Sequence, residues 1–344
     1  MKILIIVGSK SISIKDLGSS KDILTRSKLL IENGCDIKQL RVPSRNDDKL
    51  LSILKNKNLN NTDVILFEHT RYPKTLRYIK TQFPKIKRLV RTHNAEFLHG
   101  VDKIKALVNT YGMRTITRPM YLFKLLYRAL NSLYLDIKCA SLSSAILSCN
   151  EIESRSYWSL FKDKDSIFNV NTYTELSSHE PNLSAGSNVL LMGSILPTEF
   201  NDNSFKILSD ELKISQEDIK FNVTGAYSYF RLTDKRVDIK GIVKDYIKEM
   251  SNNDIICIPS PYGYGIKTRI YEGLYLGKRV FVHRKIHQRL PLLLRRNVFS
   301  WSGKKGSLLK ELKLCINPPY IYPTNDLKQY VEKSNHEFLS SFNM

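Results

Sequence analysis

No stretch of the 344-residue sequence approaches 18 uninterrupted apolar residues, so we expect no membrane-spanning helix. Cysteine is scarce: the five cysteines are scattered, odd in number and form no Cys-x-x-Cys pair. This pattern indicates neither a disulfide framework nor a zinc cluster, and a reducing compartment fits best. The apolar run 3–7 is too short for the core of a signal peptide and leads directly into a Gly-Ser turn. We therefore expect a cytoplasmic protein.

Acidic residues are also few. Asp and Glu number 33 against 54 Lys and Arg, which gives a formal net charge of +21 and a pI near 9.6. This balance favours an anionic partner, which could be nucleic acid, acidic lipid or a phosphorylated substrate. With 42% hydrophobic and 25% charged residues, the chain has the composition of a globular protein. Its length favours two domains over a single core.

Short apolar runs alternate with longer helical patterns along the chain, which is typical of strand and helix units around parallel sheets. We therefore predict an α/β fold. The runs predicted to be strands are 2–7, 36–41, 63–67, 87–92, 144–148, 188–192, 220–224, 254–258 and 279–283.

A polar segment near the middle of the chain separates two such units. Residues 177–188, SSHEPNLSAGSN, contain Pro and Gly and are the best candidate for a linker. The second unit opens with a strand that runs into Gly193, as the first opens with a strand that runs into Gly8. Two facing open sheets form a cleft at the carboxyl ends of their strands, where doubly wound folds bind ligands. We predict domains over 1–180 and 188–324.

Positive charge is concentrated in residues 72–138, which hold fourteen Lys or Arg against three acidic residues. Within this block, 118–135 places Leu and aromatic residues at helical spacing with three cations between them. Such a helix can lie in the interface of an anionic membrane, and a domain helix that buries its apolar face explains the pattern as well. Nucleic acid is the weaker alternative and is not expected, since no zinc finger, RNA-recognition signature or helix-turn-helix pattern accompanies the charge.

Segment 259–280, PSPYGYGIKTRIYEGLYLGKRV, carries the clearest chemical pattern. It follows a predicted strand, offers the glycine turn 263–265, and then begins a helix whose first turns carry Lys267 and Arg269. A glycine turn lets N–H groups at a helix N-terminus approach a phosphate, and the helix dipole favours the negative charge. Glu272, further along, has two oxygens that could accept hydrogen bonds from the diol of a ribose. As spacing alone the pattern is weak, because a structural turn before a helix explains it too.

The run GYGIKTRIYEGLYLGKRVFV resembles the donor-binding segment of retaining glycosyltransferases of the GT-B fold, family 4. Other pieces agree in order and spacing. RTHNAEFLHG at 91–100 is similar to the family's His-Asn-x-Glu segment, and SAILSCNEIE at 144–153 to its last N-domain strand and the turn after it. Residues 189–208 resemble the opening of the C-terminal domain, and 237–260 the Gly-x-Val-x-Asp run before the donor strand. The resemblance spans roughly 60–285.

The resemblance implies a GT-B fold, in which two Rossmann-like domains face a central cleft and a C-terminal helix, here 325–344, crosses back to the first domain. It also implies that a nucleotide-sugar donor binds at one group of residues. These are Gly193, Gly263, Gly265, Ile266, Lys267, Thr268, Arg269 and Glu272.

The predicted catalytic residues are His93, Lys267 and Arg269. In the family a histidine like His93 contacts the donor sugar near the reacting carbon. Gly8, His69 and Glu96 are predicted on the acceptor side. Each has a structural alternative: a strand-to-helix turn for Gly8, a loop position for His69 and a helix cap for Glu96.

The sequence departs from the family pattern at two points. Many members have a glutamate where this chain has Tyr264, which leaves the choice of sugar open. The family's Arg and Lys pair after Gly193 is also missing, so Lys267 and Arg269 would supply the cations for the diphosphate. Since the histidines show no metal-ligand spacing, we predict neither a catalytic metal nor a cofactor.

The resemblance implies a glycosyltransferase that moves a sugar from a nucleotide diphosphate to a saccharide or lipid-linked acceptor with retention of configuration. The family implies a role in surface polysaccharide or lipopolysaccharide assembly. The basic block 72–138 could hold the protein peripherally at the inner face of an anionic membrane. Two alternatives remain: a nucleotide-sugar epimerase of GT-B shape, and a non-enzymatic protein that binds polyanions.

Overall fold

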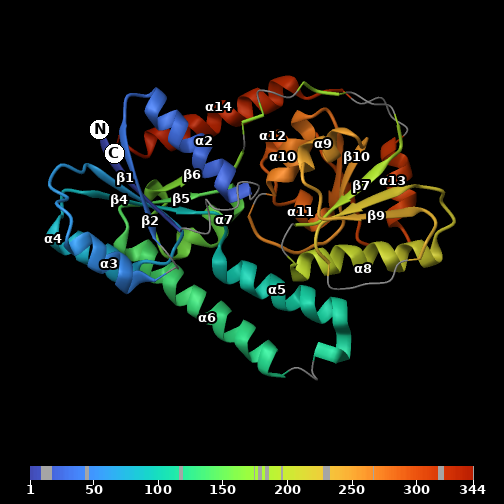
Figure 1. Ribbon diagram of the computed structural model, residues 1–344, viewed down its shortest axis with the longest axis horizontal. Coiled ribbons are helices and arrows are strands. Elements are labelled where there is room, and N and C mark those ends of the chain that lie inside the picture. The colour runs from blue at the N-terminus through green and yellow to red at the C-terminus, as the bar shows by residue number, and fades with distance from the viewer. Residues whose placement is uncertain are drawn as a thin grey trace.

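Two six-stranded parallel sheets, each covered by helices on both faces, make up the computed structural model (Figure 1). The structure describes residues 1–8, 18–42, 46–115, 119–173, 175–176, 180–182, 186–194, 197–227, 233–265, 267–316 and 321–343. Parts of the predicted linker, 177–179 and 183–185, lie outside the described residues.

The first sheet has the strand order β2-β1-β3-β4-β5-β6, and every neighbouring pair is parallel. This order reverses direction beside β1, as in doubly wound folds. The bounds are β1 Lys2–Gly8, β2 Asp36–Val42, β3 Val64–Glu68, β4 Lys87–Thr92, β5 Ala145–Ser148 and β6 Ile167–Asn169.

The second sheet has the order β12-β11-β10-β7-β8-β9 and is also parallel throughout. Its bounds are β7 Val189–Met192, β8 Phe221–Thr224, β9 Val237–Gly241, β10 Ile255–Ile258, β11 Arg279–His283 and β12 Phe299–Trp301.

Helices cover both faces of each sheet, because strands buried on both sides need a cover on both. Helices α2 and α14 pack on one face of the first sheet, and α3, α4 and α6 on the other. On the second sheet, α8 and α13 lie on one face and α9 to α12 on the other. The helices are α2 Gly18–Glu32, α3 Asp47–Lys55, α4 Pro73–Gln82, α5 Glu96–Tyr111, α6 Pro119–Leu142, α7 Glu151–Ser156, α8 Glu199–Ile214, α9 Tyr246–Ser251, α10 Thr268–Tyr275, α11 Arg284–His287, α12 Leu292–Arg295, α13 Leu308–Ile316 and α14 Thr324–Ser340.

All nine predicted strands are present, each within one residue of the predicted bounds. The prediction missed three strands, β6, β9 and β12, and all three lie at the edges of the sheets. Their side chains are less buried than those of the central strands, so they do not form continuous apolar runs.

Helix α14 packs against both units (Figure 1). Its first half contributes Leu327 and Tyr330 to the core of the second sheet, and its last turn contributes Phe338 to the core of the first. Buried Arg26 on α2 holds it there, since Nη2 donates to Ser334 Oγ and Nη1 to Asn335 Oδ1. The end of the chain therefore connects the two sheets by packing.

Candidate functional site

A cavity of about 370 Å³ lies between the two sheets and is lined by residues of both units. Its walls are formed by the segments that follow the carboxyl ends of β4, β6, β7 and β10 and by the facing sides of α5, α8 and α10. This is the edge at which parallel α/β sheets bind ligands. The lining residues are His93, Asn94, His99, Lys103, Thr172, Met192, Ser194, Thr198, Phe200, Asn201, Ser204, Ile258, Ser260, Gly263, Tyr264, Lys267, Thr268 and Arg269.

The wall formed by the first unit is built around His93, directly after β4. Its Nε2 lies 2.9 Å from Oε2 of Glu68, the last residue of β3, and its ring centroid lies 4.7 Å from that of His69. His69 has a φ of +116°, and its N–H donates to the Arg91 carbonyl at 2.9 Å, which holds this turn against β4. The predicted residues His93 and His69 therefore lie side by side, although His69 is not among the described residues that line the cavity.

Buried charges behind His93 are compensated by one another. Arg91 is fully buried; it pairs with Asp22 of α2 and lies 3.9 Å from Glu68. Burial alone would lower the pKa of the Arg91 guanidinium, but the carboxylates of Asp22 and Glu68 raise it above its ordinary value. The guanidinium thus remains charged, and its contact with Glu68 fixes the position of that carboxylate behind the histidine.

The wall formed by the second unit is the start of α10. Burial lowers the pKa of Lys267 to about 8, and the neighbouring cations Arg269 and Arg289 add to this effect. Burial also lowers the pKa of Arg269, whose Nη1 donates to the Met192 carbonyl at 2.9 Å. The predicted residues Lys267, Thr268 and Arg269 all line the cavity, as His93 does. Two cations at a helix N-terminus form a favourable place for an anion.

The glycine turn before α10 adopts a backbone that requires glycine. Gly263 and Gly265 have φ of +102° and +84°, in the left-handed region. Their N–H groups donate to carboxylates of the first unit: Gly263 to Asp102 Oδ2 at 3.0 Å and Gly265 to Glu153 Oε1 at 2.7 Å. The N–H groups of these two predicted donor-binding residues are therefore already bonded in this structure. Ile266 lies outside the described residues.

Glu272, predicted to hold the ribose, is buried on α10 with 1% of its surface exposed. Its Oε1 accepts a hydrogen bond of 2.8 Å from the Tyr246 hydroxyl, and the ammonium of Lys21 lies 4.0 Å from the centre of that tyrosine ring. Glu272 is not one of the described residues that line the cavity. Its role as the ribose ligand stays a prediction.

Gly193 meets a packing requirement at the end of β7. Its N–H donates to the Thr224 carbonyl at 2.6 Å, and a Cβ on it would lie 2.7 Å from the Tyr227 hydroxyl. Gly8 is buried at the end of β1, and Glu96 forms an ion pair of 3.5 Å with Arg71 at the start of α5. In the described part of the chain, none of these three predicted residues lines the cavity.

The prediction missed several residues at the cavity. His99 and Lys103 follow Glu96 at helical spacing on α5, and that spacing after the His93 turn was the available signal. Burial lowers the pKa of His99 to about 4, so its ring is neutral, and it lies edge-on to Phe200 of α8 at 5.1 Å between ring centres. Behind Tyr264, Arg289 is not among the described residues that line the cavity; it stacks on the Tyr264 ring at 4.0 Å, and no sequence motif indicated it.

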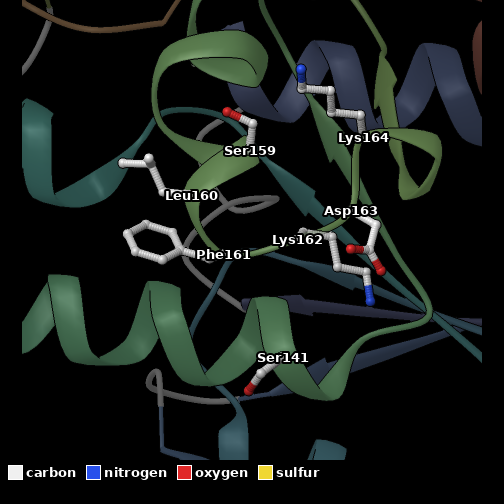
Figure 2. A pocket seen from close by; sticks show the side chains of 7 residues that line it. All are labelled: Ser141, Ser159, Leu160, Phe161, Lys162, Asp163 and Lys164. Carbon is white, nitrogen blue, oxygen red and sulfur yellow. The ribbon is translucent and has the colours of Figure 1, made fainter.

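A second hollow, of about 480 Å³, lies on the first unit (Figure 2). It is lined by Ser141 at the end of α6 and by 159–164, the segment that leads into β6. These residues precede β5 and β6, so the hollow is at the amino edge of the sheet and the cavity at the carboxyl edge. Lys162 is held in place there, because its Nζ donates to the Ser143 carbonyl at 2.7 Å. The hollow is therefore separate from the candidate site.

Helix α6 contains most of the predicted segment 118–135, and it exposes a long apolar face. The exposed apolar residues along it are Met120, Tyr121, Phe123, Leu126, Tyr127, Leu130, Tyr134 and Ile137. Its other side is buried against the first unit by Leu125, Ala129 and Cys139. No helix in the described ranges is long and apolar enough to cross a membrane.

No protein-family model matches the sequence, and no curated protein matches it either. Solved structures do match over nearly the whole chain. Sucrose-phosphate synthase from Thermosynechococcus elongatus is 12% identical with a TM-score of 0.66, and the match covers 99% of this chain and 95% of that one. Anabaena HepE in complex with UDP and glucose is 12% identical with a TM-score of 0.60, over 99% and 95%.

These are structures of GT-B glycosyltransferases. The chain has the GT-B fold. A glycosyltransferase from Rickettsia africae gives the same result at 14% identity and a TM-score of 0.53, covering 99% of this chain and 94% of that one. At such identities the likeness concerns the fold, and the predicted fold class is confirmed.

Proposed function

We propose that this GT-B chain is a glycosyltransferase that takes its sugar from a nucleotide diphosphate. The observation that carries the proposal is the cavity itself, which is lined by the cationic start of α10 from the second unit and by His93 from the first. HepE, a neighbour in fold, was solved with UDP and with UDP-glucose, which makes uridine nucleotides the first donors to test. We propose that the acceptor is a saccharide or a lipid-linked saccharide, as in surface polysaccharide assembly.

The chemistry requires stabilisation of the diphosphate as the bond to the sugar breaks. Negative charge develops on the leaving phosphate, and we propose that Lys267, Arg269 and the first-turn N–H groups of α10 stabilise it, which is supported by the position of both side chains at the cavity. We propose that these groups act without a metal ion. Activity in the presence of EDTA tests this point, and a loss restored only by a divalent cation would contradict it.

We propose that transfer retains the anomeric configuration, as in family 4. The described residues that line the cavity include no Asp or Glu, so none of them offers a carboxylate nucleophile. This supports a front-face mechanism, in which the leaving phosphate assists deprotonation of the acceptor hydroxyl and His93 supports the sugar. It also disfavours the epimerase alternative, which needs acidic groups for proton abstraction. The anomeric configuration of the product, read by NMR, decides between retention and inversion.

Membrane association belongs to the same proposal. Around the exposed face of α6, Lys124 and Arg128 are exposed, whereas the acidic residues of 72–138 face inward: Asp102 and Asp136 are buried and Glu96 is paired with Arg71. An apolar face with cations beside it and no exposed acid in that block complements an anionic lipid surface. We propose that the protein acts at the inner face of the membrane through this helix.

A thermal-shift screen of nucleotide sugars tests the proposed function. A ligand at a hundred times its Kd stabilises the native state by about 2.7 kcal/mol, which raises the melting temperature by several degrees. We expect this for UDP-sugars or GDP-sugars and not for the free sugars. Stabilisation by polyanions such as heparin, without any by nucleotide diphosphates, would favour the non-enzymatic alternative.

A further inference from the structure

The glycine turn 263–265 is held by carboxylates from the other half of the molecule. Glu153, on α7 of the first unit, is fully buried. Its Oε2 accepts the Ala95 N–H at 2.7 Å and its Oε1 accepts the Gly265 N–H at 2.7 Å. One carboxylate thus joins the turn that carries His93 to the turn that leads into α10.

The local sequence places Glu153 for this contact. Asn150, the N-cap of α7, accepts the N–H groups of Ile152 and Glu153 at 2.8 and 3.0 Å, and its amide donates to Glu153 Oε1 at 3.3 Å. The cap fixes the first turn of α7, so the Glu153 side chain projects from a rigid support. Burial raises the pKa of Glu153 to about 7, opposed by the hydrogen bonds from Gly265 and Ala95. A carboxyl group this buried depends on its partners from both units.

A second carboxylate holds the other glycine. Asp102 on α5 accepts the Gly263 N–H at 3.0 Å, and its Oδ2 also lies 3.2 Å from Nη1 of Arg289. The same Arg289 nitrogen donates to the Gly263 carbonyl at 3.3 Å, and the guanidinium stacks on Tyr264. Both glycine N–H groups of the turn are thus bonded to side chains of the first unit.

We propose that Glu153 and Asp102 are positioning residues: they hold the glycine turn through its N–H groups and so present the first turn of α10 to the cavity. On this view the two glycine N–H groups are structural, and a diphosphate is met instead by Lys267, Arg269 and the first N–H groups of α10. Because Lys267, the N-cap of α10, has no side-chain capping bond, the helix start depends on the turn before it for its position. The expected effect of these residues on donor binding rests on the proposed function. Their role in positioning the glycine turn does not depend on it.

Hydrogen–deuterium exchange on the ligand-free protein tests the hold directly. We expect faster exchange in a peptide spanning 262–268 for Glu153→Ala, with a smaller change for Glu153→Gln, whose amide can accept from only one of the two N–H groups. Glu151→Gln is the matched control: it lies on the same helix, is partly exposed and pairs only with Arg155 among the described residues. A peptide far from the contact, over β11, should be unchanged in all variants.

Nucleotide binding is the second readout. We expect Glu153→Gln to raise the Kd for UDP by about tenfold, as loss of one hydrogen bond to a charged group would, with a melting temperature close to that of the wild type. If the wild type binds neither UDP nor GDP, the proposed function fails. The exchange result still decides whether Glu153 and Asp102 hold the glycine turn. The inference is overturned if Glu153→Gln has the melting temperature of the wild type and its exchange over 262–268 is also unchanged. Should Glu153→Ala fail to fold, Glu153→Gln and Asp102→Asn provide the same comparison.

Discussion

The two walls of the cavity differ in whether their buried charges are compensated by groups of opposite sign. On the side of the first unit, Arg91 is enclosed with Asp22 and Glu68, and the charges compensate one another. On the side of the second unit, Lys267 and Arg269 face the cavity, and no carboxylate lines it in the part of the chain that the structure describes. The first arrangement makes a rigid wall, and the second leaves positive charge for a ligand to neutralise.

The largest effect should follow from breaking the compensated wall. Arg91→Met removes the cation shared by buried Asp22 and Glu68 and leaves only Arg26, 3.9 Å from Asp22, beside them, which should cost about 3–5 kcal/mol in the free energy of unfolding. Chemical denaturation measures it, with Arg77→Met on the exposed face of α4 as the control. A cost below about 1 kcal/mol would mean that the two walls do not differ as described.

Removing a cation from the other wall should affect function and leave stability nearly unchanged. Arg269→Ala or Lys267→Ala should lower kcat/KM by about 10²–10³, the usual cost of removing a group that stabilises developing charge. The exposed Arg284→Ala, beyond β11, is the control. If neither the Lys267 nor the Arg269 substitution changes kcat/KM, these side chains at the start of α10 do not stabilise the leaving diphosphate.

The pH dependence of donor binding should report Lys267. Because the pKa of Lys267 is lowered to about 8, its ammonium is charged below that pH and loses its charge above it. Affinity for a nucleotide diphosphate should therefore fall as pH rises through about 8, roughly up to tenfold per pH unit when one proton is required. The linked effect on folding has the opposite sign: between about 8 and 10.5 the unfolded chain binds more protons, so this residue adds stability as pH rises. In Lys267→Arg, which keeps its charge, the loss of affinity near pH 8 should disappear. Calorimetry across pH 7–9 measures the affinity of the wild type and of the variant.

A substitution of Glu272 distinguishes a carboxylate that binds the ligand from one that only stabilises the structure. If it holds the ribose, Glu272→Gln should weaken UDP binding about tenfold in calorimetry, since one charged hydrogen bond is lost. If the bond from Tyr246 is its only task, the affinity should stay the same while the melting temperature falls. The second result would move the ribose site elsewhere along the cavity.

The smallest effect is expected at the surface of α6. Replacing Lys124 or Arg128 by Gln should weaken sedimentation with anionic vesicles by about 1 kcal/mol each, or roughly fivefold, because each cation near anionic lipid contributes that amount. Binding to neutral vesicles and thermal stability should not change, since both side chains are exposed. Equal binding to anionic and neutral vesicles in the wild type would contradict the proposed membrane contact.

Much of the fold could be predicted because central parallel strands are apolar on both faces. The runs 2–7, 63–67 and 254–258 are almost entirely apolar, and they appear as β1, β3 and β10. The edge strands β6, β9 and β12 could not be found this way, since one side of each is open and polar residues are tolerated there.

At the site, local chemistry could be predicted and distant partners could not. A histidine after a strand and cations at the start of a helix are local features, so His93, Lys267 and Arg269 were within reach and all three line the cavity. Glu153, Asp102 and Arg289 meet the glycine turn from 112, 161 and 26 residues away in sequence. No spacing rule connects residues at such distances.

The amino-acid sequence alone determined the α/β class, the central strands, the cationic start of α10 and the apolar, basic face of α6, because each depends on neighbours within a few turns or strands. Only the tertiary structure decided which carboxylates hold the glycine turn, that Glu272 is buried, and which wall keeps its charge compensated. Those outcomes depend on how two separately folded sheets meet, and the free energy of a buried charge is set by whatever group the other side brings to it.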